Sequence, residues 1–445
     1  MGDTPSTGDV PAPKPGGRPL EFGIYPGGPA GQIIVPAAPK PEDQAKTFAA
    51  LGKLRPAGGP FTVHIYRSYL NASNDAREDT EHRRLVALYT GRGYGVEIVI
   101  RYRRDGDPAG FAKFVRGVVG RFGDNPLVRG FQVTNEANFA ASGDSSDGVY
   151  AGARDALIQG VIAAKAEARL RGYSRLRIGF NWFYRTDPNN EDSFWNYLGE
   201  HGGKRFVDAL DWVGLDVYPG TFFPPAAPAA STGDFVINAL SQLRQCFLHA
   251  ANIPKTVPIH IEENGYPTGP GRSYDDQRAA LESMVRAANT YRANYNVTNY
   301  FWFDLRDADS SSPNFQQQYG LLRSDYTPKP AFASYRSLIS QLSLREKPPP
   351  GVDPVPVGGG PAAILRASCY RRGVFAQVQG EGAKRAQHVT FRARGRRADD
   401  GHHPFGRHIR LDETEGRERI DVSAVVRYPS RTAVLKGAIR CRIED

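Results

Sequence analysis

The sequence predicts an α/β protein in which a (β/α)8 TIM barrel is followed by a small C-terminal all-β, sandwich-like domain. Over about 325 residues, apolar strand-like runs alternate eight times with amphipathic helix-like segments. Strands that alternate with helices form parallel sheets, and eight such units close a barrel. A doubly wound open sheet is the alternative, but no GxGxxG motif follows the first predicted strand.

Each strand is predicted from a short apolar or alternating run that ends at turn residues. In chain order these runs cover residues 20–28, 61–70, 94–104, 129–139, 175–185, 209–220, 257–269 and 299–307. The helices are predicted from apolar residues at helical spacing, and each of them follows a strand. They cover residues 42–54, 75–93, 110–123, 147–172, 192–198, 234–251, 275–294 and 329–342.

Composition divides the chain into four parts. Residues 1–19 are rich in Pro, Gly and Thr and predict a flexible tail, and residues 20–344 contain the barrel pattern. Residues 345–361 form a Pro/Gly linker, and residues 362–445 contain short alternating runs typical of a β-sandwich. Cys369 and Cys441 bracket this last part, and both a disulfide and two free thiols are compatible with their positions.

Composition also excludes several classes of protein. A hydrophobic content of 40% with 11% aromatic residues is typical of a folded globular chain. No apolar run is long enough for a membrane span, and the sequence as given has no signal peptide. The nine histidines show no HxH or HExxH spacing, and three cysteines cannot form a Cys-rich site. We therefore predict neither a metal site nor a cofactor.

The basic charge is concentrated near the C-terminus. Residues 346–445 contain 19 Lys and Arg but only 12 Asp and Glu. This excess of seven positive charges is most of the net charge of +10. A basic domain of this kind suits contact with an anionic glycan or a cell surface. An Arg-rich solvated strand face is nonetheless the favoured explanation of this charge, and a nucleic-acid partner is not expected.

Carboxylates end two of the predicted strands, where a barrel gathers its reactive groups. Glu136 ends the fourth strand, and Glu262 and Glu263 end the seventh. Two carboxylates across a barrel mouth suit cleavage of a glycosidic bond, because one protonates the leaving oxygen while the other stays ionised. A lyase or an aldolase would need a strand-end Lys, a phosphate-binding loop or metal ligands, and no predicted strand ends in these.

Four segments resemble clan A glycoside hydrolases, the large (β/α)8 group with an acid/base glutamate after strand four and a nucleophile after strand seven. They are TNEAN, EENGYP, YFWFDLRD and YGLLRSDYTPKPAF, and the resemblance covers about residues 20–344. Many members have Pro after the acid/base, where this chain has Ala137. The family retains anomeric configuration, which implies a glycosyl-enzyme intermediate.

The resemblance implies that Glu136 is the acid/base and Glu263 the nucleophile. Alternation agrees, because Ile259, Ile261 and Glu263 share one strand face, whereas Glu262 faces the other way. The predicted substrate-binding residues are Arg67, Tyr102, Asn135, Asn181, Trp182, Tyr218 and Trp302. By the resemblance, Arg67 keeps the nucleophile ionised, Tyr218 donates a hydrogen bond to it, and Trp302 lies under the sugar.

The predicted function is a retaining glycoside hydrolase that degrades a poly- or oligosaccharide by double displacement. The resemblance, with the Arg- and Ala-rich composition, favours a bacterial protein in a secreted or extracytoplasmic location. A transglycosylase using the same site and a non-catalytic carbohydrate-binding barrel are the alternatives.

Overall fold

The computed structural model describes residues 10–27, 40–56, 59–70, 72–185, 188–343, 363–370, 373–379, 383–401, 405–412, 418–429 and 432–441. Eight parallel strands close into a barrel in chain order, with β1 paired to both β2 and β8. The strands are β1 Glu21–Ile24, β2 Phe61–Tyr69, β3 Gly95–Tyr102, β4 Val128–Val133, β5 Arg177–Phe183, β6 Trp212–Val217, β7 Ile259–Asn264 and β8 Val297–Trp302. The predicted fold class is confirmed.

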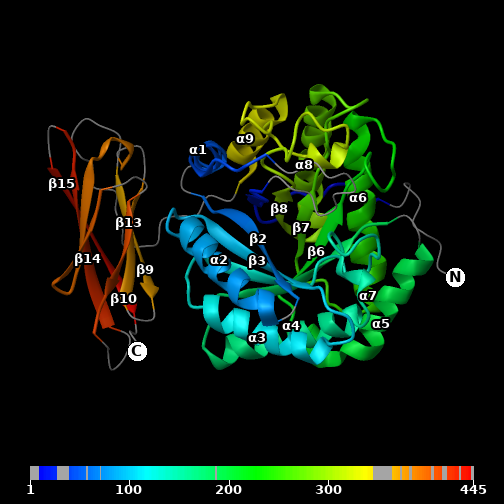
Figure 1. The fold of residues 1–445 in the computed structure, drawn as a ribbon, viewed down its shortest axis with the longest axis horizontal. Helices are drawn as coiled ribbons and strands as arrows, with labels where there is room; N and C mark the ends of the chain where they lie inside the picture. Colours follow the sequence, from blue (N-terminus) through cyan, green and yellow to red (C-terminus); the bar gives the residue numbers. More distant parts are fainter. Residues whose placement is uncertain are drawn as a thin grey trace.

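Helices surround this barrel, as Figure 1 shows. They are α1 Gln44–Leu54, α2 Ala72–Thr90, α3 Pro108–Phe122, α4 Ala153–Leu170, α5 Pro188–Val207, α6 Thr232–Gln242, α7 Leu248–Ala250, α8 Tyr274–Tyr295 and α9 Pro330–Leu342. Local signals start several of them: Ser273 and Asp276 form a capping box on α8, and Asp107 caps α3. None of the described helices is long and apolar enough to cross a bilayer.

The two faces of the barrel strands differ in chemistry. In β2, Val63 and Ile65 belong to the apolar core under the helices, whereas His64 lies in the barrel interior and contacts Glu97 of β3. In the strand pairing, inward-facing residues of one strand lie opposite inward-facing residues of the next, so the two faces continue around the barrel. Aliphatic residues therefore mark the outer face, and polar or small residues mark the inner one.

The C-terminal part is a small antiparallel β-sandwich. Its strands are β9 Ile364–Tyr370, β10 Gly373–Gln379, β11 His388–Ala393, β12 Arg396–Asp400, β13 Gly406–Arg410, β14 Glu418–Arg427 and β15 Thr432–Cys441. They form a three-stranded sheet, β13-β10-β9, and a four-stranded sheet, β12-β11-β14-β15, that share an apolar core. The predicted linker and the side chains of Cys369 and Cys441 lie outside the described residues, so the disulfide stays a prediction.

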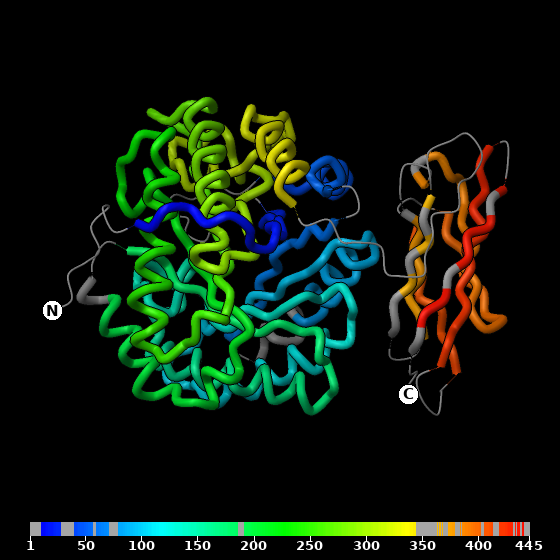
Figure 2. Tube along the Cα trace, turned by 180° about the vertical axis from the view of Figure 1, so that it is seen from behind, coloured from blue at the N-terminus to red at the C-terminus, as the bar shows by residue number. Residues whose placement is uncertain are grey.

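The sandwich lies beside the barrel with its three-stranded sheet nearer to it, as Figures 1 and 2 both show. Gln377 of β10 lies against Gly93, in the turn between α2 and β3. This turn precedes a strand, so the sandwich meets the end of the barrel where strands begin. The strand ends that carry the candidate carboxylates lie at the opposite end.

Candidate active site

Glu136 lies in the turn after β4, with a left-handed backbone φ of 49°. Its N–H donates to Asn181 Oδ1 at 2.8 Å, and Ser146 Oγ donates to its Oε2 at 2.6 Å. Burial, followed by the nearby charge of Glu263, raises the pKa of Glu136 well above its usual range. Burial thus favours the protonated form of Glu136, which a general acid needs.

Glu263, near the end of β7, accepts a hydrogen bond on each carboxylate oxygen. Tyr66 OH donates to Oε1 at 2.5 Å, and Tyr218 OH donates to Oε2 at 2.7 Å. Burial and the charge of Glu263 raise the pKa of both phenols, which keeps them protonated as donors. Two hydroxyl donors on one carboxylate suit its ionised form, because an ionised carboxylate only accepts hydrogen bonds.

A third carboxylate, Asp216 of β6, lies beside this pair. One oxygen of each of Glu136, Asp216 and Glu263 lies within 4.8 Å of the others. Such a short separation fits the spacing of about 5–5.5 Å in retaining glycosidases better than the wider spacing of inverting ones. Burial, then the charges of Glu263 and Glu136, raises the pKa of Asp216 well above its usual range. These effects favour the protonated, neutral form of Asp216.

Asp216 ends a predicted strand but is absent from the predicted site residues. Its signal in the sequence is its place two residues before Tyr218 on the same strand face. The three carboxylates also have the spacing of cation ligands. The hydrogen bonds from Ser146, Tyr66 and Tyr218 account for their arrangement as an acid and a nucleophile.

Asn135 and Asn181 lie together at this pair. Asn181 Nδ2 donates to Asn135 Oδ1 at 3.0 Å and also to Asp216, and its Oδ1 accepts the N–H of Glu136. Asn135 Nδ2 donates to the carbonyl of Ser145 at 2.7 Å. Asn181, which is fully buried, thus ties β4, β5 and β6 together beneath the carboxylates.

A buried ion pair holds the loop after β4. Arg101 of β3 pairs with Asp147 at 2.9 Å, and neither side chain is more than slightly exposed. Asp147 also accepts the N–H of Tyr102 at 2.7 Å and that of Asn135 at 2.8 Å. This pair fixes the loop that carries Glu136 and places the positive charge of Arg101 near enough to oppose the rise in its pKa.

A β-bulge in β7 decides which way its acids face. Ile261 lies opposite Leu215 of β6, but Glu263 lies opposite the next residue, Asp216, so Glu262 is the extra residue. Both acids therefore enter the barrel. The prediction that Glu262 faces outward is wrong, because Ile259 and Ile261 face the helices, so alternation turns Glu262 inward: it is buried and contacts interior side chains.

Glu262 belongs to a buried network inside the barrel. Its Oε2 lies 2.9 Å from His64 Nε2, its Oε1 lies 2.8 Å from His260 Nδ1, and His64 also lies 3.3 Å from Glu97. Burial alone would raise the pKa of Glu262, but hydrogen bonds with His260 and His64 outweigh it and lower the pKa to about 2.

The other members of the network have shifted pKa values too. Burial opposes the charged form of His64, but Glu262 and Glu97 outweigh it and raise its pKa to about 10. Burial and the charge of Glu262 raise the pKa of Glu97 to about 8. An ionised Glu262 is therefore paired with a charged His64 at neutral pH. These three residues also have the spacing of metal ligands, and their mutual hydrogen bonds account for it.

Four predicted binding residues face the helices and lie away from the carboxylates. The Arg67 guanidinium lies over the Phe114 ring of α3, 5.0 Å from its centroid, and the Trp302 ring lies 6.3 Å from that of Tyr335 in α9. Arg67 therefore does not take the predicted place beside the nucleophile, and Trp302 does not lie under a sugar at the barrel mouth.

Tyr102 and Trp182 are corrected in the same way. Tyr102 OH donates to the Ala151 carbonyl at 2.9 Å, and the Trp182 indole donates to Glu191 of α5. Both are fully buried on the outer strand face. The physical reason is similar for all four residues: Arg67, Tyr102 and Trp182 share the parity of aliphatic residues in their strands, and Trp302 shares that of the buried Tyr300.

Aromatic side chains that do lie at the strand ends form a separate cluster. Phe303 takes the place expected of Trp302, stacking on Tyr25 with ring centroids 5.0 Å apart and contacting Tyr218 edge-on. Phe183 and Tyr319 complete the cluster, and Phe222 and Phe223 of the loop after β6 pack against it. The carboxylates therefore have an aromatic wall beside them, as ligand sites often do.

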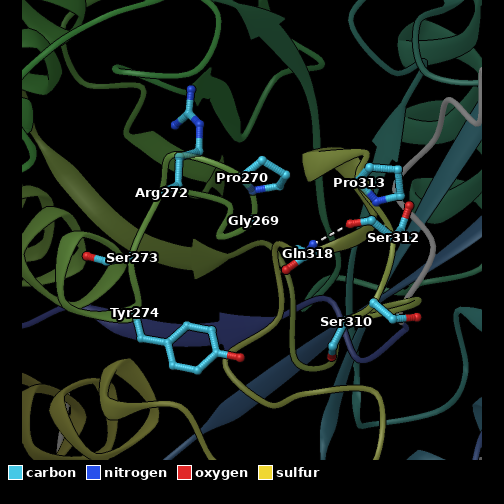
Figure 3. Close-up of a pocket in the computed structure, with 10 residues that line it drawn as sticks. Gly269, Pro270, Arg272, Ser273, Tyr274, Ser310, Ser312, Pro313 and Gln318 are labelled. Carbon is cyan, nitrogen blue, oxygen red and sulfur yellow. Dashed lines mark hydrogen bonds between the residues drawn. The ribbon is translucent and has the colours of Figure 1, made fainter.

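The loops after β7 and β8 also enclose a polar cavity of about 580 Å³, shown in Figure 3. It is lined by Gly269, Pro270, Arg272, Ser273, Tyr274, Ser310, Ser311, Ser312, Pro313 and Gln318. Gln318 Nε2 donates to the Ser312 carbonyl at 2.6 Å and so links its walls. Its hydroxyl, amide and guanidinium groups suit a polyhydroxylated ligand.

Comparison with known proteins supports the fold of this site. No family profile matches the chain. A segment of 142 residues, 31% of the chain, is 25% identical to a probable glucan endo-1,3-beta-glucosidase of Aspergillus niger, and the match spans 28% of that protein. A similar match of 143 residues, 25% identical, involves the corresponding protein of Aspergillus oryzae.

Two solved structures are similar over most of the chain. One is a GH5_18 protein from Streptomyces cattleya in complex with GlcNAc, with 15% identity, 75% of this chain and 82% of that chain covered, and a TM-score of 0.52. The other is a family 39 glycoside hydrolase from Bacteroides cellulosilyticus, with 14% identity, 89% and 81% covered, and a TM-score of 0.50. The chain has the TIM-barrel fold of the glycoside hydrolases.

Proposed function

We propose that the protein is a retaining glycoside hydrolase in which Glu136 is the acid/base and Glu263 the nucleophile. The observation that carries this proposal is the contrast between two adjacent acids. Glu136 has a pKa raised by burial, whereas Glu263 accepts hydroxyl hydrogen bonds on both oxygens. Two acids of opposite protonation across one bond are what glycoside cleavage needs.

The reaction proceeds in two displacements. Glu136 gives its proton to the glycosidic oxygen while Glu263 attacks the anomeric carbon, so the bond to the leaving group breaks and a glycosyl ester forms. Glu136, now ionised, takes a proton from water, which attacks the same carbon and releases Glu263. Tyr66 and Tyr218 orient Glu263 throughout, and the cluster of Phe303 and Tyr25 lies beside it.

A β-1,3-glucan is the substrate class to test first. The partial match to a probable glucan endo-1,3-beta-glucosidase supports this choice. The polar cavity after β7 and β8 is a candidate subsite for a sugar further along such a chain. Activity on laminarin that exceeds activity on cellulose, xylan and mannan would support the proposal. Longer products formed at high donor concentration would instead indicate a transglycosylase.

Replacing Glu136 with Gln tests the acid/base role. Hydrolysis of a glycan is expected to fall by about 10²–10⁴-fold, because its alcohol leaving group needs a proton. Hydrolysis of a dinitrophenyl glycoside is expected to fall far less in the bond-breaking step, because that leaving group departs unprotonated. Pre-steady-state kinetics on both substrates measure the difference. An equal loss on both would contradict the assignment.

A substitution at Ser146 tests whether Glu136 sets the alkaline limb of the pH profile. The hydrogen bond from Ser146 lowers the pKa of Glu136, so Ser146→Ala is expected to raise that pKa. The alkaline limb of kcat/KM, where Glu136 loses its proton, should then move to higher pH. Ser142→Ala is the control, because its hydroxyl lies in the same loop and accepts the N–H of Asp144 at 3.3 Å. An unmoved limb would contradict the role of Glu136.

Tyr66, rather than Arg67, is expected to support the nucleophile. Tyr66→Phe removes one hydrogen bond to an ionised carboxylate, so kcat should fall by about 10- to 100-fold. Tyr69→Phe is the matched control, since Tyr69 lies in the same strand and donates to Asp107 at 2.6 Å on the outside of the barrel. Steady-state kinetics of both variants measure the two losses of kcat. Equal losses would contradict the role of Tyr66 as a donor to the nucleophile.

A further inference from the structure

The outer face of the four-stranded sheet carries a line of cations across its strands. Arg397 of β12 lies opposite Arg392 of β11, Arg392 lies opposite Ser423 of β14, and Ser423 lies opposite Lys436 of β15. Opposite residues in an antiparallel pair point to the same face. All three cations are exposed. We call Arg392, Arg397 and Lys436 the basic strip.

Within the described ranges, two cations of the strip lack the carboxylate partners that several other cations of the sheet have. Nearby cations have carboxylate partners, such as Arg419 with Asp421 at 3.1 Å and Arg396 with Asp412 at 3.1 Å. Within the strip, Arg397 contacts Asp399 at 2.8 Å. Arg392 and Lys436 have no carboxylate partner among the residues that the structure describes.

Two arginines directly opposite each other also oppose folding. Like charges at directly opposite positions destabilise a β-sheet, and Arg392 and Arg397 occupy such positions. A sequence that keeps a local conflict of this kind often does so at a functional site. An anion laid across the strands would remove the repulsion and supply the missing partners of Arg392 and Lys436.

The face around the strip indicates what kind of anion fits. The described residues that share this face, among them Thr390, Asp421, Ser423, Val425 and Val434, include no phenylalanine, tyrosine or tryptophan. Neutral sugars and unpaired bases both use aromatic stacking, which this face does not offer. Strands are about 4.8 Å apart, so the strip spans about 14 Å in a straight line. A linear chain with regularly spaced negative charges matches it.

We propose that the basic strip binds an anionic polysaccharide that carries carboxylates and so holds the catalytic barrel on its substrate matrix. A polysaccharide is favoured over nucleic acid because the sheet is joined to a barrel with a proposed glycosidase site, so the inference rests on that function. The four-stranded sheet is the one farther from the barrel in Figures 1 and 2. Binding there leaves the barrel mouth free.

The test is binding of the full chain to polygalacturonate, measured by affinity electrophoresis of the inactive Glu263→Ala protein. Adding Arg392→Ser and Lys436→Ser is expected to weaken binding by about 10- to 30-fold. The control adds Arg419→Ser and Arg394→Ser, which remove the same charge from cations paired with Asp421 and Glu418. The control should stay within about threefold, and binding should weaken as salt rises.

Other outcomes would overturn the proposal. Equal weakening by both double substitutions would show only a general attraction to positive charge. Retention on laminarin that weakens equally with Arg392→Ser and Lys436→Ser, or stronger retention on duplex DNA, would mean that the strip does not select an anionic polysaccharide. In the active protein, the Arg392→Ser and Lys436→Ser pair should leave hydrolysis of a soluble aryl glycoside unchanged. If the unaltered protein hydrolyses the aryl glycoside but does not bind polygalacturonate, the proposed function stands and the strip proposal fails. If it binds polygalacturonate but has no hydrolase activity, the strip proposal stands and the proposed function fails.

Discussion

Glu263→Ala is expected to lower kcat by about 10⁵-fold or more, the largest loss of any single change in this protein. Without Glu263 no glycosyl ester can form, and Glu136 alone can only protonate the leaving oxygen. The space left by the carboxylate lies between the Tyr66 and Tyr218 hydroxyls, which can bind a small anion. Added azide should therefore attack the anomeric carbon and give a glycosyl azide of inverted configuration.

The product distinguishes this role from a structural one. Proton NMR of the azide adduct reports its configuration, and circular dichroism reports whether the variant is folded. Glu200→Ala, an exposed glutamate of α5, is the control and should keep full activity. Folded Glu263→Ala protein that keeps more than a hundredth of the activity would contradict the assignment, as would an azide product of retained configuration.

The sequence predicted the barrel because its signals are local and repeated eight times. The sequence also placed Glu136, Asn135, Asn181 and Tyr218 at strand ends. Parallel strands in a barrel bring these ends together at one mouth. The strand face on which each side chain lies was predicted less well. Arg67 was chosen by likeness to a family, although it shares the parity of Val63 and Ile65, which face the helices. Tyr66 shares the parity of polar His64, and this signal was available in the sequence.

The same parity test applies to the other misplaced residues. Tyr102 follows Ile98 and Ile100 at spacing two, and Trp182 follows Ile178 and Phe180, so both belong to the outer face. In β7 the parity test fails. Ile259 and Ile261 face outward, and simple alternation would send Glu263 outward with them. The bulge depends on pairing with β6 and on partners far away in the chain, so no local pattern predicts it.

Glu262→Ala is expected to reduce both stability and activity, because Glu262 holds that bulge in place. Its two oxygens contact His64 of β2 and His260 of β7, which fixes the extra residue inside the barrel. Removing one partner of a buried ion pair costs about 3–5 kcal/mol of unfolding free energy. Once the bulge relaxes, Glu263 turns toward the helices and loses Tyr66, so kcat should fall by about 10³-fold beyond any unfolding.

Glu97→Gln is the matched control, because Glu97 contacts the same His64 from β3 and has no part in the bulge. It should cost less stability, since burial already raises the pKa of Glu97 to about 8 and leaves it mostly protonated at pH 7. Its kcat should stay close to that of the unaltered protein. Thermal unfolding and kcat measured on fully folded protein separate the two effects. If Glu262→Ala lost stability but kept its kcat, the β7 register would not depend on Glu262, and the bulge would have to be held by the pairing of Glu263 with Asp216 instead.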